Sequence, residues 1–229
     1  MPEEAGSDNA TAGSPLPARL MLPGLGVIMK LDAVVFPVAA FTVLYLLVAT
    51  GFSFVLGNSE FVFYIVVMLV LILVVWLVHR SVSLSRGLLW ALSLWGLLHM
   101  AGGLVPVPAS WPIDGDIRVL YSLWLIPDRL KFDQIVHVYG FGVATWVCWH
   151  GIRAAIRRRG GEATPTLGLM VLAATSGMGL GALNELIEFA ATLVMAETNV
   201  GGYLNTGWDL VANFVGAALA ATVIRLRGV

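Results

Sequence analysis

Residues 132–142 read FDQIVHVYGFG, an apolar run that carries two ionisable side chains, Asp133 and His137. The two residues are four positions apart, so a helix would place both side chains on the same face. Acids and imidazoles are costly where a helix faces lipid. The rest of the sequence must therefore indicate whether this face meets lipid or the interior of the protein.

The composition is that of a polytopic membrane protein. Of the 229 residues, 59% are hydrophobic and 12% are charged, whereas soluble domains usually carry about 25% charged residues. The mean hydropathy is +0.88. The net charge is −1 and the sequence has no basic stripe or nucleic-acid-binding module, so we expect no nucleic-acid partner. The single cysteine, Cys148, is expected to be a small buried hydrophobe.

Six apolar stretches are long enough for a bilayer crossing, which takes about 20 helical residues. They cover residues 32–55, 61–79, 87–106, 133–152, 166–190 and 207–225. The predicted fold class is therefore all-α, a polytopic bundle of about six transmembrane helices in one domain, residues 31–229. Residues 1–30 begin acidic and are rich in Pro, Gly, Ala and Ser, which predicts a disordered cytoplasmic tail.

An outer interfacial element is expected between the third and fourth stretches. Its apolar middle, Ile117–Ile126, is too short to cross a membrane, and Trp111, Tyr121 and Trp124 are expected at headgroup level. The Lys and Arg residues indicate the orientation. Of the 13, only Arg118, Arg129 and Lys131 fall on the side of this element, so the positive-inside rule predicts that both termini are cytoplasmic.

Polar residues recur at the outer ends of the last three stretches. Asp133 and His137 open the fourth stretch, and Asp209 and Asn213 open the sixth. The fifth stretch runs outward, so Glu185 and Glu188 lie roughly 28–33 Å along it at about 1.5 Å per residue. Each pair has helical i, i+3 or i, i+4 spacing and so shares a face.

Small residues continue each of these faces toward the inner side. Gly181 and Gly177 follow Glu185, Gly216 and Ala217 follow Asn213, and Gly140 and Ala144 follow His137. Small residues on a membrane helix mark the surface that packs against another helix. We therefore expect the polar pairs to converge on one interior site, with Asn184, Asn213 and the deeper His99 in supporting positions.

Two chemical interpretations of this site remain open. The catalytic candidates are His137, Glu185, Glu188, Asp133 and Asp209, which form a plausible general acid/base set. Four of them, His137, Glu185, Glu188 and Asp209, also form a plausible divalent-metal shell. Close carboxylates must be neutralised by protons, by a cation, or by the outer Arg118, Arg129 and Lys131. The alternative is a structural network in which Asp133 and Asp209 favour the N-termini of their helices.

The order of these motifs resembles VanZ-like and YjdF-like bacterial membrane proteins. An acid and a His early in one helix, the run NELIE, and the run WDLVANFVGA carry the resemblance, which covers residues 130–220. The matching positions are Asp133, His137, Glu185, Glu188, Asp209, Asn213, Gly216 and Ala217. The resemblance implies a multi-pass protein of the bacterial inner membrane that is connected with the cell envelope, and it implies no defined reaction.

Three functions are compatible with these observations. The first is a hydrolase or transferase that acts on a lipid-linked or amphiphilic substrate at the outer leaflet. The second is a cation- or proton-binding transporter or sensor, which would need a polar path to the cytoplasm. The third is an assembly partner for another membrane protein. Membrane lipids are the expected surroundings, and the sequence specifies neither an oligomeric state nor a partner chain.

Overall fold

The computed structural model describes residues 23–57, 59–195 and 198–229. These residues form six long helices: α1 (Pro23–Leu56), α2 (Ser59–Val82), α3 (Arg86–Leu104), α4 (Phe132–Arg158), α5 (Leu167–Val194) and α6 (Tyr203–Arg227). The prediction of an all-α polytopic membrane protein is confirmed. Residues 1–22 of the predicted tail lie outside the described residues, and α1 begins at Pro23.

Five of the six helices are long and apolar enough to cross a membrane, and α4 is the exception. This helix has 27 residues, but Asp133, Gln134 and His137 at its start and the arginines at its end reduce its mean hydropathy. It packs against α2, α3, α5 and α6. The polar side chains of α4 therefore meet neighbouring helices, so a central helix can span the bundle without an apolar composition.

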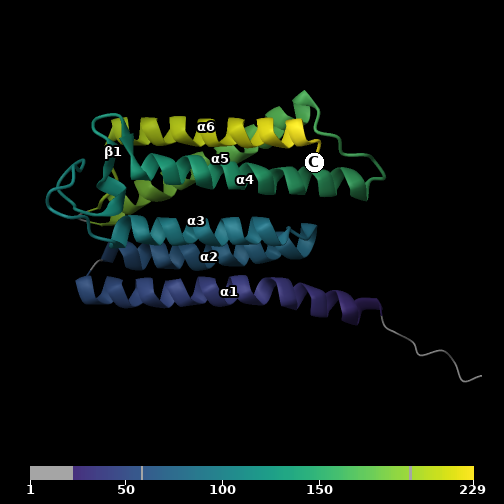
Figure 1. The fold of residues 1–229 in the computed structure, drawn as a ribbon, viewed down its shortest axis with the longest axis horizontal. Helices are drawn as coiled ribbons and strands as arrows, with labels where there is room; N and C mark the ends of the chain where they lie inside the picture. Colours follow the sequence, from purple (N-terminus) through teal and green to yellow (C-terminus); the bar gives the residue numbers. More distant parts are fainter. Residues whose placement is uncertain (1–22, 58, 196–197) are drawn as a thin grey trace, which may run out of the picture.

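The helices lie roughly parallel in two groups (Figure 1), with α1, α2 and α3 in one and α4, α5 and α6 in the other. Residues 105–131, which we call the end cap, cover one end of the bundle, where α4 and α6 begin. We call this the capped end. The start of α1 and the C-terminus both lie at the opposite end (Figure 1), as an even number of crossings requires.

The end cap, where the sequence predicted an interfacial or re-entrant element, has secondary structure of its own. It contains a 3-10 turn, η1 (Leu120–Ser122), and an antiparallel pair of short strands, β1 (Trp124–Ile126) and β2 (Leu130–Lys131). Tyr121 points into the bundle, where its ring occupies the space that a side chain at Gly102 would need. Burial raises the pKa of the Tyr121 phenol well above its usual range.

Small residues allow the helices around the site to approach closely, as the sequence predicted. Gly140, Gly177, Gly181 and Gly216 are all buried in the bundle. At Gly216, an added Cβ would collide with the carbonyl oxygen of Val138 on α4. Helices α4 and α6 therefore meet backbone to backbone, which fixes the level of Asn213 relative to His137.

This contact predicts that Gly216→Ala destabilises the bundle, by about 1–3 kcal/mol or more, because the backbone of α4 must move to admit a methyl group. The matched control is Gly179→Ala, since Gly179 lies within α5 with nothing near its missing Cβ. Thermal unfolding in detergent measures the difference. Equal melting temperatures for the two variants would show that the close α4–α6 contact contributes nothing to stability.

Candidate functional site

The imidazole of His137 lies at the centre of the polar cluster, on the second turn of α4. The residue is only 6% exposed. Its Nδ1 is 2.9 Å from Oδ1 of Asn213 and 3.7 Å from Oε1 of Glu185. Its Nε2 is 3.5 Å from Oδ1 of Asp133, one turn earlier on α4. One ring therefore connects side chains from α4, α5 and α6.

Helix α6 contributes two deeply buried polar side chains. Asp209 is 0% exposed and Asn213 is 1% exposed. Oδ2 of Asp209 accepts a hydrogen bond of 2.6 Å from Nδ2 of Asn205, one turn earlier. Asn205 in turn accepts a hydrogen bond from Nζ of Lys131 in the end cap. The Asp209 carboxylate is thus oriented by Asn205, which the sequence did not mark as a candidate, and Asn205 is held in turn by Lys131.

Helix α5 contributes two carboxylates with different surroundings. Glu188 is half-buried, and its Oε1 accepts a hydrogen bond of 2.8 Å from Nδ2 of Asn184. Glu185 is 9% exposed, and neither of its carboxylate oxygens has a hydrogen-bond partner among the described residues. Asn184 therefore supports Glu188 and makes no hydrogen bond to His137, while Glu185 is buried with its oxygens unsatisfied.

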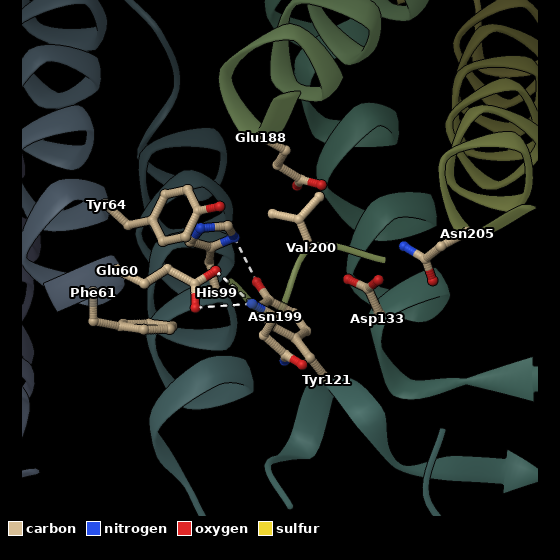
Figure 2. A pocket seen from close by; sticks show the side chains of 10 residues that line it. All are labelled: Glu60, Phe61, Tyr64, His99, Tyr121, Asp133, Glu188, Asn199, Val200 and Asn205. Carbon is tan, nitrogen blue, oxygen red and sulfur yellow. Dashed lines mark hydrogen bonds between the residues drawn. The ribbon is translucent and has the colours of Figure 1, made fainter. Parts of the chain in front are cut away.

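A small cavity of about 30 Å³ opens beside this cluster at the capped end. Figure 2 shows the side chains that line it, among them Asp133 and Glu188 from the cluster and His99 from α3. His99 Nδ1 lies 2.5 Å from the hydroxyl of Tyr121. His99 thus borders the cavity, and it is tied to the end cap.

The candidate catalytic residues that the sequence predicted lie close together in the structure. Asp133, His137 and Asp209 each offer a ligand atom within 4.8 Å of the others, and so do His137, Glu185 and Glu188. The two overlapping sets share the imidazole, and Asn213 contacts it directly. Cys148 lies three helical turns further along α4, half-buried, and belongs to neither set.

Nearby basic residues do not neutralise these acids. Lys131 pairs with Asp114 at 3.2 Å, and Arg118 donates to the backbone carbonyls of Pro108 and Trp111. Across the described ranges, no Lys or Arg forms an ion pair with the four carboxylates of the cluster. Of the three means of neutralisation that the sequence allowed, protons or a bound cation therefore remain.

Comparison with known proteins places the chain in a family. The model of a family described as "Predicted membrane protein (DUF2238)" matches residues 36–228. The chain belongs to this family. The family is described only as a membrane protein, and its description gives no activity. The resemblance to VanZ-like and YjdF-like proteins therefore stays a prediction. No curated protein and no solved structure matches the chain.

The segment before α6 in this DUF2238 protein is attached to α2 by a carboxylate that the sequence analysis missed. Both oxygens of Glu60 accept hydrogen bonds from the backbone N–H of Asn199, at 3.0 and 3.1 Å. Glu60 is buried, and Asn199 and Val200 line the cavity (Figure 2). Glu60 lies in the first turn of the apolar helix α2. An acidic residue there is also expected from the helix dipole alone, so the sequence gives no separate signal for this contact.

We predict that Glu60→Ala increases hydrogen exchange at Asn199, because the amide loses both of its acceptors. Hydrogen–deuterium exchange of peptides that contain residues 198–202 measures the change in nanodiscs. Glu162→Ala, which removes an exposed carboxylate at the opposite end, is the control and should leave this exchange unaltered. Unchanged exchange in Glu60→Ala would mean that other contacts hold the segment over the cavity.

Proposed function

We propose that this membrane protein is a hydrolase or transferase that acts on a lipid-linked or amphiphilic substrate at the capped end. The single observation that carries the proposal is the small cavity lined by the carboxylates of Asp133 and Glu188, beside the imidazole of His137. A volume of about 30 Å³ suits one water molecule. A water held between general acids and bases is what hydrolysis requires.

The roles follow from the contacts. His137 is the base, because its Nε2 faces Asp133 near the cavity. Glu188 lines the cavity and is oriented by Asn184, which suits it to exchange a proton with the reacting water or the leaving group. Glu185 faces Nδ1 of the same imidazole. Asp133 and Asp209 orient the site and stabilise positive charge on the ring.

An apolar groove supports an amphiphilic substrate. It has a volume of about 490 Å³ and is lined by α3, α4 and α6, including Val138, Gly142 and Gly216. Val138 follows His137 directly, and Gly216 lies one turn beyond Asn213. The groove therefore begins within one turn of the polar cluster along α4 and α6, although it shares no lining residue with the cavity. Its walls are long helices of the bundle. We assign the groove to the hydrocarbon chain of an amphiphilic substrate, because such chains surround these helices in a membrane.

The protein interior between the polar cluster and the opposite end of the bundle is apolar. This favours a reaction at one membrane surface over transport of an ion across the membrane. Toward the opposite end, Trp149, Met170, Ala173, Ala221 and Ile224 form an apolar core between α4, α5 and α6. Trp149 and Ile224 are fully buried. A transported ion would have to pass this layer without polar partners, which is costly. The Lys and Arg distribution supports an outer-leaflet location for the capped end.

The test is incubation of the purified full-length protein in nanodiscs with a lipid extract of its native membrane, followed by mass spectrometry. We expect one class of lipid-linked species to be consumed by the wild type, and Glu188→Gln and His137→Asn to lower the rate by about 10²–10⁴-fold. Glu162→Gln should retain the wild-type rate. Equal turnover in all variants, with only the melting temperatures of Glu188→Gln and His137→Asn reduced, would assign the cluster a structural role.

A second prediction tests the groove. Leu219→Trp fills a position that lines it, so we expect a higher KM for long-chain species with kcat retained, because only the binding of the chain is obstructed. Leu172→Trp is the matched control, since Leu172 is exposed on α5 to nearly the same extent and lies outside the groove. The same KM in both variants would remove the groove from substrate binding.

A further inference from the structure

We propose that Asp133, His137 and Asp209 bind one divalent transition-metal ion of the Zn²⁺ or Mn²⁺ class. One atom from each side chain lies within 4.8 Å of the other two. The three residues come from the first two turns of α4 and α6, helices that meet closely at Gly216. This site is argued from its own contacts. Because the ion would take the lone pair of His137 Nε2, Glu188, which lines the cavity, would serve as the base in the metal-bound protein.

The hydrogen bond to Asn213 identifies the ligand nitrogen. Oδ1 of Asn213 lies 2.9 Å from Nδ1 of His137, and an amide oxygen can only accept a hydrogen bond. Nδ1 therefore carries a proton, and in the neutral form of the ring, which is the form that binds metals, the lone pair is on Nε2, the nitrogen that faces Asp133. Histidine ligands in proteins usually donate their other ring N–H in this way, which fixes the ring for the metal.

Asp209 gives independent support for a ligand at this position. The residue is 0% exposed, yet its Oδ1 has no hydrogen-bond partner in the part of the chain that the structure describes. Its other oxygen is held by Asn205. Buried carboxylate oxygens without a partner are costly, and a cation would satisfy this one. Asn205 would then orient the carboxylate, as hydrogen bonds commonly do for carboxylate ligands.

Charge favours the same conclusion. The neighbouring ammonium group, on Lys131, is bonded to Asp114 and Asn205 and forms no ion pair with Asp133 or Asp209. A divalent cation would supply the two positive charges that the two acids lack.

The ligand types indicate the class of metal. Imidazole favours Zn²⁺ and similar ions, while carboxylates accept Zn²⁺ and Mn²⁺. Adjacent ligand atoms in such sites are about 3 Å apart at bond lengths of about 2.1 Å, so binding must draw the three side chains closer together. Asp133 is half-buried and lines the cavity, so the ion would also be accessible to water.

The competing set is His137, Glu185 and Glu188. Glu185 lies on the Nδ1 side of the ring, at 3.7 Å. A metal ion in that set would use Nδ1, whose proton is already directed at Asn213. The geometry therefore favours the aspartate set, and the glutamate set becomes an outcome of the test.

The test is isothermal titration of Zn²⁺ into the full-length protein in nanodiscs after removal of metals with a chelator, with Mn²⁺ binding followed by electron paramagnetic resonance. We expect one Zn²⁺ per chain and a higher melting temperature when it binds. Asp133→Asn and Asp209→Asn should raise Kd by at least about tenfold. Glu185→Gln should raise Kd by less than either aspartate variant, because Glu185 contacts the ring but is not a ligand. Asp114→Asn, which removes no ligand, should change Kd by less than about threefold.

Variants at Asn213 test the ligand nitrogen. Asn213→Leu removes the acceptor for the Nδ1 proton and should weaken Zn²⁺ binding by about 10–100-fold, whereas Asn213→Asp keeps an acceptor and should retain binding. Melting temperatures of the metal-free variants identify any that fail to fold. Three results would overturn the proposal: no bound Zn²⁺ or Mn²⁺ in the wild type, wild-type affinity in both folded aspartate variants, or a loss confined to Glu185→Gln. Turnover of lipid is measured separately, so either proposal can fail alone.

Discussion

The site depends on one constraint, which is that four carboxylates surround one imidazole at the end of an apolar bundle. Their negative charges repel one another, and burial makes that repulsion stronger than it would be in water. His137 offers at most one positive charge, and Lys131 is bound to Asp114 and Asn205. Protons or a cation must therefore accompany the acids. Acid/base chemistry and metal binding both follow from this need.

Close helix packing makes the arrangement possible. Gly216 lets α6 contact the backbone of α4, and Gly181 leaves room on α5 for the amide of Asn213. A larger side chain at either position would push the helices apart and separate the polar atoms. Helix α4 can be the least apolar of the six because its polar face contacts protein on several sides. The same packing leaves the groove beside α4 that we assign to a hydrocarbon chain.

The main elements of the site could be predicted because they lie on helices. Helical spacing places Asp133 with His137 and Asp209 with Asn213, and the small residues beyond them indicate an inward face. The contacts that were missed involve loops or residues next to them. Glu60 acts on the backbone of Asn199, and Lys131 reaches Asn205 from the end cap. Such contacts depend on how irregular segments fold over the bundle. Helical periodicity in the sequence gives no information about the conformation of these segments.

The amino-acid sequence alone determined the membrane class, the six helices, and the gathering of polar residues at one level, because hydropathy and helical period act locally. Only the tertiary structure decided which atoms meet. It placed Asn213 on Nδ1 and Asp133 on Nε2 of the same ring. Within the described part of the chain, it left both oxygens of Glu185 and one oxygen of Asp209 buried without a hydrogen bond. Those relations depend on the distances between α4, α5 and α6, which close packing of small side chains sets across residues far apart in the chain.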